Sequence, residues 1–298
     1  MRTGICTTDF SGEAIRKRQP QRTANDLFAR MWELGFACTQ FSFESVAEAE
    51  FIATGQLELP AEISAGTIDA VMRASEKYNI PIRVFNGTFN MAHPSEEVRR
   101  EGVRRLGILS ETAKAMGVPF ISLCSGTANP DMLWAPSTEN DSNEAWMRMF
   151  DTMQRAVETA EKYGVTFAIE AEPANVISTP DRARRVMDEI GSSRLKMILD
   201  CANLFPHGGA LKEKVQETIR TAFEAYGKDI VIAHGKDILD SREGGEFCGA
   251  GLGIVDFTYT AEMLRKYDYK GDMFLHGISG ENDMPRALKH WKNAARET

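Results

Sequence analysis

Four consecutive apolar runs in the second half of the sequence each end in an acidic residue or a histidine. The runs, each with the residue that follows it, are Val165–Ile169 with Glu170, Lys196–Leu199 with Asp200, Ile230–Ala233 with His234, and Met273–Leu275 with His276. Carboxylate oxygens and imidazole nitrogens together suit a divalent cation and leave positions open for water or a substrate. These residues predict a site for Zn²⁺, Mn²⁺ or Co²⁺, whereas Mg²⁺ prefers oxygen ligands and fits two histidines less well.

The apolar runs themselves are predicted to be strands. Each is too short for a helix and almost wholly apolar, as is typical of strands buried on both faces of a parallel sheet. Four earlier runs share this character, namely Thr3–Cys6, Ala37–Phe41, Ile82–Phe85 and Phe120–Leu123. Segments with a helical spacing of apolar residues lie between the runs, for example Trp146–Tyr163. Thr179 before Pro180, and Thr23 three residues before Asp26, are typical helix starts.

Eight strand–helix units in 298 residues average about 37 residues each, which is the size that a (β/α)8 TIM barrel needs. We therefore predict an α/β protein with one TIM barrel domain over residues 1–298. An open, doubly wound sheet is the competing arrangement. It is disfavoured because Cys6-Thr7-Thr8-Asp9 follows the first strand, where a dinucleotide-binding sheet carries GxGxxG.

In a TIM barrel the carboxyl ends of the strands surround a common axis, and reactive groups lie there. The four residues that end the last strands are therefore expected to converge. A single acid or histidine at a strand end often caps a helix or pairs with a neighbour instead. Recurrence on four consecutive strands favours a shared cation.

Two other features could indicate a different chemistry. Gly249–Gly253 lacks the Lys-Ser/Thr ending of a phosphate-binding loop and does not follow a strand directly, so we predict a turn before a helix capped by Asp256. Lys236 could form a Schiff base with a carbonyl substrate, but the adjacent Asp237 favours a protonated amine. We therefore expect neither a phosphate loop nor a Schiff base.

Composition excludes further classes of function. The formal net charge of −8 argues against nucleic-acid partners, because phosphate binding needs clustered Lys and Arg. No run of about 18 apolar residues occurs, which predicts no membrane span, and the first residues lack the apolar stretch of a signal peptide. The five cysteines form no CxxC pair or disulfide framework, so we expect reduced thiols and a cytoplasmic protein. The sequence is compatible with a homo-oligomer.

Longer motifs accompany the strand ends. They are Asn86-Gly87-Thr88-Phe89-Asn90-Met91-Ala92-His93-Pro94, Leu123-Cys124-Ser125-Gly126-Thr127, Met132-Leu133-Trp134, Ile169-Glu170-Ala171-Glu172-Pro173-Ala174-Asn175, Leu199-Asp200-Cys201-Ala202-Asn203-Leu204 and Ala233-His234-Gly235-Lys236-Asp237. With these motifs in this order, the chain resembles the sugar phosphate isomerase/epimerase group of the xylose-isomerase-like barrel superfamily. The resemblance covers essentially the whole chain and implies the same barrel fold.

The resemblance also implies a set of metal ligands. The superfamily's usual site is a divalent metal held by Glu, Asp, His and Glu from strands five to eight, which assigns Glu170, Asp200 and His234 to the first three places. His276 stands where the family has the last glutamate, and we expect it to be the fourth ligand. Glu172 is the second-choice ligand or an acid/base group.

The function implied is that of a metal-dependent isomerase or epimerase of a sugar or sugar phosphate, which moves a proton through a metal-stabilised enediolate. Glu170 is the expected base, with His276 or Glu172 as its partner. His276 replaces one of the two glutamates that move protons in the related ketose epimerases, and Glu281 downstream is a candidate to compensate. The expected substrate-binding residues are His93, Asn203, Lys236 and Trp134, with Phe89 as a further wall of the pocket.

Two other functions stay open on the same scaffold. A metal-dependent dehydratase, a lyase of a cyclic polyol or inosose, would expel a hydroxyl group. A metal-free carbohydrate-binding barrel would account for the unusual His276. An abasic-site endonuclease of the superfamily is disfavoured, because it needs three metals, many histidine ligands and a basic face, whereas this chain has five histidines and a net charge of −8.

Overall fold

The structure is a computed structural model and describes residues 1–298 except 12–20, 50, 52–53 and 297–298. Its central parallel strands are β1 (Thr3–Cys6), β2 (Thr39–Phe41), β3 (Ile82–Asn86), β4 (Phe120–Cys124), β5 (Thr166–Glu170), β6 (Leu195–Asp200), β7 (Ile230–Ile238) and β9 (Met273–Leu275). The helices between and after them are α2 (Ala24–Glu33), α3 (Ala65–Tyr78), α4 (Glu96–Met116), α5 (Asn143–Tyr163), α6 (Pro180–Ile190), α7 (Val215–Tyr226), α8 (Phe257–Lys266) and α9 (Met284–Ala294).

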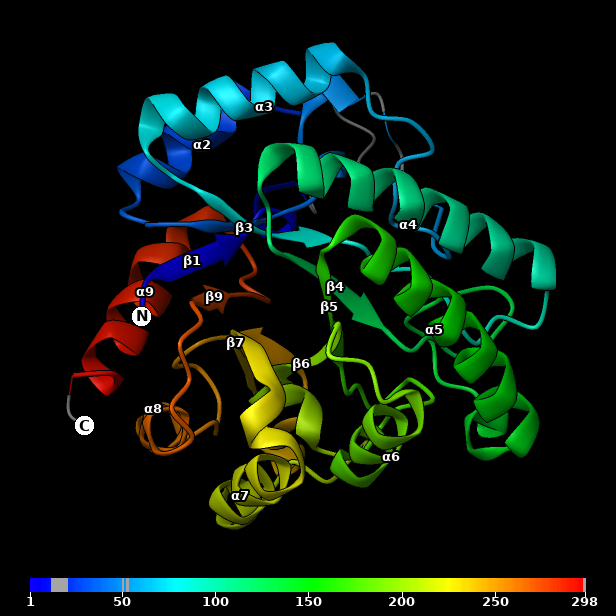
Figure 1. Ribbon diagram of the computed structural model, residues 1–298. Coiled ribbons are helices and arrows are strands. Elements are labelled where there is room, and N and C mark those ends of the chain that lie inside the picture. Colours follow the sequence, from blue (N-terminus) through cyan, green and yellow to red (C-terminus); the bar gives the residue numbers. More distant parts are fainter. Residues whose placement is uncertain (12–20, 50, 52–53, 297–298) are drawn as a thin grey trace.

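These strands close into a barrel. Neighbours pair in chain order from β1 to β7, and β9 completes the ring by pairing with both β7 and β1. All of these pairings are parallel, and Figure 1 shows the helices arranged around the outside of the strands. The predicted (β/α)8 TIM barrel is confirmed.

One strand is longer than its sequence pattern indicates. β7 runs past Ala233 to Ile238 because a short strand, β8 (Phe247–Gly249), pairs antiparallel with its second half. The sequence does not reveal this partner, since Gly249 begins the glycine-rich stretch that reads as a turn. His234 and Lys236 consequently lie within a hydrogen-bonded strand rather than in the loop after it.

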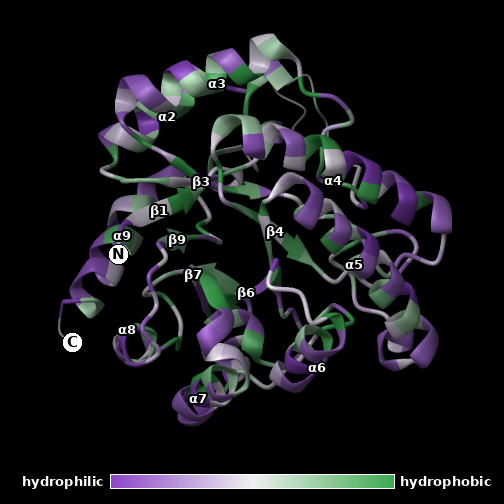
Figure 2. Cartoon of the chain, viewed as in Figure 1, coloured by the Kyte–Doolittle hydropathy of each residue, from purple (hydrophilic) through white to green (hydrophobic). Residues whose placement is uncertain are grey.

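Apolar side chains form two separate cores. The larger lies between the strands and the helices and includes Phe28, Phe85 and Met153. The smaller lies inside the barrel and consists of Cys6, Cys38, Val84, Ala168, Ile198, Ile232 and Phe274. Figure 2 shows apolar strands inside a ring of helices with many hydrophilic residues. In the described part of the chain, no helix has both the length and the apolar composition needed to span a bilayer.

The alternation of side chains along a strand positions the polar residues at one end of the barrel. Successive side chains point to opposite faces, so a residue two positions beyond an inward-facing one also points inward. Two positions beyond members of the smaller core stand Gln40, Asn86, Glu170, Asp200, His234 and His276. The apolar interior therefore ends in a layer of polar side chains at the carboxyl ends of the strands, where TIM barrels carry their active sites.

The predicted helix boundaries are also found. The side chains of Thr23 and Thr179 cap α2 and α6 by accepting the backbone N–H of the third residue of each helix. Asp256 caps α8 in the same way, by accepting the N–H of Tyr259. These caps fix where the helices begin and thereby the path of the loops that precede them.

Two glycines of α4 should respond in opposite ways to alanine. A Cβ on Gly102 would lie 2.0 Å from Cδ2 of Phe89, whereas one on Gly107 would meet nothing within 4 Å. Gly107→Ala should stabilise the fold by about 0.5–1 kcal/mol through helix propensity. Gly102→Ala should destabilise it by about 1–3 kcal/mol through overpacking. Urea unfolding measures both changes, and a stabilising Gly102→Ala would contradict the packing described.

Candidate metal centre and active-site cavity

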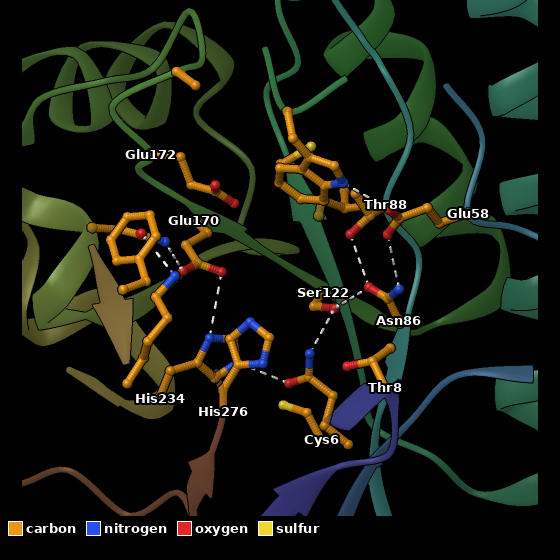
Figure 3. Close-up of a pocket in the computed structure, with 18 of the residues that line it drawn as sticks. Cys6, Thr8, Glu58, Asn86, Thr88, Ser122, Glu170, Glu172, His234 and His276 are labelled. Atoms are coloured by element: carbon orange, nitrogen blue, oxygen red, sulfur yellow. Dashed lines mark hydrogen bonds and ion pairs between the residues drawn. The ribbon is translucent and has the colours of Figure 1, made fainter. Parts of the chain in front are cut away.

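Three side chains from neighbouring strands form a candidate metal centre. Glu170 ends β5, Asp200 ends β6 and His234 lies in β7, and one ligand atom from each lies within 4.8 Å of the other two. Nδ1 of His234 is 3.4 Å from Oε2 of Glu170 and 3.8 Å from Oδ2 of Asp200. All three residues are buried. Figure 3 shows Glu170 and His234 facing each other.

Two of these ligand atoms lack hydrogen-bond partners. Oδ2 of Asp200 and Nδ1 of His234 are buried and form no hydrogen bond of good geometry within the described residues, and the only cation beside Oδ2 there is Nζ of Lys236. A buried polar atom without a partner costs about 1–3 kcal/mol. A divalent cation would use both atoms, so the side chains present fit a metal ion.

Gln40 sets the orientation of the His234 ring. Its Oε1 lies 3.0 Å from Nε2 of His234, while its own amide group donates to Oγ of Ser122 at 3.3 Å. Because an amide oxygen only accepts hydrogen bonds, Nε2 of His234 carries the proton in this pair. Nδ1 then keeps its lone pair toward the two carboxylates, which is the tautomer that a metal ligand needs.

Replacing Gln40 by leucine should weaken metal binding. Loss of the oxygen that orients a ligating histidine typically costs about 10- to 100-fold in metal affinity. Calorimetric titration with Zn²⁺ or Mn²⁺ measures the change. Gln216→Leu is the matched control, since Gln216 bonds Asp256 at the exposed surface of α7. Equal affinities for the wild type and Gln40→Leu would contradict the assignment.

Lys236 and Asn203 close one side of the centre. Nζ of Lys236 lies 3.2 Å from Oδ2 of Asp200 and donates to Oδ1 of Asn203 at 2.8 Å. Nδ2 of Asn203 donates to Oε1 of Glu170 at 2.6 Å. Burial opposes the charge on Lys236, but the carboxylates of Asp200 and Glu170 raise the pKa of the amine overall. The protonated amine that the sequence predicts is therefore held by Asp200.

Asp237 faces away from the centre, as expected for the residue next to Lys236 in a strand. Its carboxylate accepts the backbone N–H groups of Gly251, Gly253 and Val255 at 2.9, 3.0 and 2.9 Å. Asp237 is thus not the residue that keeps Lys236 protonated, contrary to the sequence interpretation. The glycine-rich stretch forms the predicted turn, and two of its N–H groups, those of Gly251 and Gly253, are bound by Asp237.

The centre opens into a cavity of about 440 Å³ at the carboxyl end of the barrel. On the wall opposite the triad, Glu58 accepts hydrogen bonds from Nε1 of Trp134 at 2.8 Å and Nδ2 of Asn86 at 3.4 Å. Oδ1 of Asn86 in turn accepts the hydroxyls of Thr88 and Ser122 at 2.8 and 3.3 Å. Figure 3 shows this network across the cavity from Glu170 and Glu172. Converging hydroxyl, amide and carboxylate groups suit a ligand rich in hydroxyl groups.

Two carboxyl groups on the triad side differ in their pKa values. Burial would raise the pKa of Glu170, but the positive charge that His234 carries when protonated and the charge of Lys236 lower it overall. Burial and the negative charge of Glu170 raise the pKa of Glu172 well above its usual range. The opposite shifts of the two pKa values favour an ionised Glu170 and a Glu172 that carries a proton.

Comparison with known proteins identifies the family of this chain. The sequence matches the xylose isomerase-like TIM barrel family over residues 28–294. The chain belongs to this family. Inosose dehydratase of Glaesserella parasuis serovar 5 (strain SH0165) is 26% identical over 147 residues, which are 44% of this chain and 47% of that relative. The match thus spans about half the length of the curated relative.

Solved structures of low sequence identity share the fold. A D-tagatose 3-epimerase-like protein superposes with a TM-score of 0.71 at 19% identity, covering 100% of this chain and 99% of that one. The IOLI protein with a bound zinc atom superposes with a TM-score of 0.69 at 15% identity, covering 100% and 97%. At these identities the comparison establishes the barrel fold alone.

His276 departs from the glutamate that the resemblance places at the last strand. It follows β9 and lines the cavity, with its ring centroid 5.6 Å from that of His234. Its Nδ1 lies 3.4 Å from Oδ1 of Asp9. His276 is not among the residues whose ligand atoms all lie within 4.8 Å of one another in the described part of the chain. Its role as the fourth ligand stays a prediction.

Some residues predicted from the family motifs lie away from the cavity. Nδ1 of His93 accepts the N–H of Ser95 at 3.0 Å, and Nε2 lies 3.1 Å from the carbonyl oxygen of Pro130. Both ring nitrogens therefore hold loops together, and the geometry does not support a substrate contact by His93. Phe89 is fully buried in the larger core and forms no wall of the cavity.

Glu281 cannot stand in for a missing glutamate at the site. Its carboxylate forms ion pairs with Arg22 at 2.5 Å and Arg30 at 2.9 Å, and it is not among the residues that line the cavity. The other predicted residues do reach the cavity: Asn203, Lys236, Trp134 and Glu172 all line it.

Sequence reasoning missed several cavity residues, namely Gln40, Glu44, Glu58, Thr88, Ser122, His207 and Phe247. A usable signal existed for Gln40 and Ser122, because both occupy inward-facing strand positions that are polar in otherwise apolar runs. His207 is an exposed residue that also borders the cavity, and no strand or helix pattern marks it. Glu58 and Phe247 come from a loop and from β8, where no periodicity marks them.

Proposed function

We propose that this protein is a metal-dependent sugar isomerase or epimerase whose ion is held by Glu170, Asp200 and Nδ1 of His234. The observation that carries the proposal is a buried triad with unpartnered ligand atoms at the carboxyl end of a barrel of this family. The triad opens into a cavity whose opposite wall suits hydroxyl groups.

A divalent ion at this position would supply Lewis-acid polarisation of a substrate carbonyl. The carboxyl group of Glu172 lines the cavity and forms no hydrogen bond with another described side chain. It is therefore free to donate its proton to the substrate and to take a proton back. The oxygens of Glu170 already face Asn203 and His234, so the proposal assigns ligation to Glu170 and proton transfer to Glu172 and His276. The prediction that Glu170 is also the base stays untested.

Lys236, Asn203 and Trp134 are proposed to position the substrate. The ammonium group of Lys236 and the amide of Asn203 border the cavity beside the triad, where they can bind carbonyl or hydroxyl oxygens. Phe247 places its ring centroid 4.3 Å from Nζ of Lys236 and shields the amine from water. Trp134 forms part of the opposite wall.

The proposed metal is Zn²⁺, Mn²⁺ or Co²⁺ rather than Mg²⁺. One imidazole nitrogen with two carboxylates is a mixed set of donors, which these ions accept more readily than Mg²⁺ does. The IOLI protein of the same fold carries zinc. We further propose reduced, cytoplasmic surroundings, because all five cysteines are free and buried.

A dehydratase of a cyclic polyol or inosose is the second candidate, and the similarity to inosose dehydratase favours it. The same residues would remove the proton, after which a β-hydroxyl group would leave. Incubation with Mn²⁺ in D₂O and a panel of ketoses, sugar phosphates and inososes separates the candidates by mass spectrometry. Isomerisation or epimerisation conserves the skeleton and exchanges hydrogen for deuterium, whereas dehydration removes one water. No exchange and no metal binding would contradict both and favour a carbohydrate-binding barrel.

A further inference from the structure

The carboxylate of Asp9 lies against the residue that ends the last strand of the barrel. β1 and β9 are paired neighbours, so the residues that follow Cys6 and Leu275 meet at the carboxyl end of the barrel. The Asp9 side chain is 7% exposed, and its Oδ1 lies 3.4 Å from Nδ1 of His276. In the described part of the chain Nδ1 of His276 is buried and has no hydrogen-bond partner with good geometry, which leaves Asp9 as its facing acceptor.

Asp9 also binds the backbone of the two residues that follow His276. Its two carboxylate oxygens accept the N–H groups of Gly277 at 3.3 Å and Ile278 at 3.1 Å. Gly277 has a φ of +71°, which favours glycine, and a Cβ there would lie 2.9 Å from Cγ of Lys236. The turn after β9 is therefore built so that successive N–H groups point at one carboxylate.

The other edge of the imidazole faces the cavity. The His276 side chain is 33% exposed and lines the cavity, although its Nδ1 is buried against Asp9. With Nδ1 buried against Asp9, Nε2 is the ring nitrogen left to face a substrate, and the Cys6 thiol also contacts the ring. The ring packs against that of His234, with the centroids 5.6 Å apart, and His276 is not among the described residues whose ligand atoms all lie within 4.8 Å of one another.

We propose that Asp9 and His276 form a dyad in which Asp9 positions the imidazole and Nε2 of His276 moves the substrate proton, in place of metal ligation by His276. This rests on the proposed function, because the proton is the one next to the sugar carbonyl. Nδ1 of His276 faces the Asp9 carboxylate at 3.4 Å, and a proton held on Nδ1 toward Asp9 leaves the lone pair of the ring on Nε2.

The step balances within the site. The C–H bond of the substrate breaks, its electron pair stays on the substrate, and a new N–H bond forms at Nε2. The imidazole becomes an imidazolium, whose charge the Asp9 carboxylate stabilises. Return of the same proton to carbon restores the neutral ring, so no oxidant or reductant is needed.

A double-mutant cycle on the metal-loaded enzyme tests the dyad. His276→Gln should lower kcat by about 10²- to 10⁴-fold, and Asp9→Asn by about 10- to 100-fold, with little change in KM. Asp9→Asn combined with His276→Gln should be no slower than His276→Gln alone, because the two residues act as a unit. Additive losses would show that Asp9 has only a structural role and would overturn the dyad.

Metal affinity is the second readout, because it distinguishes His276 as a proton-transfer group from His276 as a metal ligand. Zn²⁺ titration should give the same stoichiometry and an affinity within about threefold for the wild type, Asp9→Asn and His276→Gln, since neither side chain binds the ion. Loss of the ion in His276→Gln would make it a ligand and overturn the proposal. Asp256→Asn, which removes the same charge at the cap of α8 outside the cavity, is the control and should keep its kcat.

Nitrogen NMR of the imidazole rings decides the question without turnover. In the zinc-loaded wild type, His276 should show a protonated Nδ1 and a free Nε2, and Asp9→Asn should redistribute the tautomers. A metal-coordinated nitrogen on His276, or a protonated Nε2, would overturn the proposal. If the ring behaves as expected but no sugar is turned over, the proposed function fails while the Asp9–His276 pairing stands.

Discussion

Asp200→Asn and His234→Gln should each abolish tight metal binding and lower kcat by about 1,000-fold or more. The Lewis acid supplies several kcal/mol of transition-state stabilisation, and about 1.4 kcal/mol corresponds to a tenfold change in rate. Each variant removes the charge or the lone pair of an atom that has no hydrogen-bond partner among the described residues. Elemental analysis and calorimetric titration measure the bound metal. Steady-state turnover of the substrate that the D₂O incubation identifies measures kcat.

Asp237→Asn is the matched control for these variants. Asp237 is fully buried and next to Lys236 in β7, but it binds the turn at residues 251–255 and not the triad. Its replacement should lower the melting temperature while the protein keeps one metal ion per chain. Retention of the ion by Asp200→Asn, or its loss from Asp237→Asn alone, would contradict the assignment of ligands.

Glu172→Gln should lower kcat by about 10²- to 10⁴-fold, the usual contribution of a general acid or base, while metal binding is preserved. The amide has nearly the same shape but cannot accept or return the proton. Stopped assays give kcat and KM, and titration with Zn²⁺ gives the affinity. A variant that loses the metal would show that Glu172 is a ligand, and one that keeps wild-type kcat would remove it from the mechanism.

Glu281→Gln provides the comparison for Glu172→Gln. It is the same substitution at a carboxylate that pairs with Arg22 and Arg30 away from the cavity. We expect kcat within about twofold of the wild type, since weakening an exposed or half-exposed ion pair costs about 0–1 kcal/mol of stability. A large loss of kcat here would instead support the idea that Glu281 replaces the missing glutamate.

The barrel and its triad could be predicted because both depend on local rules. Strands buried on both sides are short apolar runs, and residues 170, 200 and 234 each follow an inward-facing apolar position by two. The alternation of side chains then brings them to one level of the barrel without any knowledge of the loops. The same rule, applied to β2 and β4, would also have found Gln40 and Ser122.

The opposite wall and the role of His276 depend on contacts between distant segments. Glu58 reaches the cavity because Leu57 forms an isolated antiparallel β-bridge with Phe89. The N–H of Glu58 also donates to the carbonyl oxygen of Thr88 at 3.0 Å. The predicted barrel implies that β9 pairs with β1, but it does not reveal that Asp9, three residues beyond β1, faces His276. The contacts of the His93 ring with Pro130 and Ser95 likewise join segments that the sequence pattern does not bring together.

Diffraction from crystals grown with Mn²⁺, collected at the absorption edge of the metal, tests the central claim most directly. We predict one anomalous peak bonded to Glu170, Asp200 and Nδ1 of His234, with His276 outside the coordination sphere and paired with Asp9. A peak elsewhere in the cavity, or none at saturating Mn²⁺ in protein that binds no metal in solution, would contradict the account.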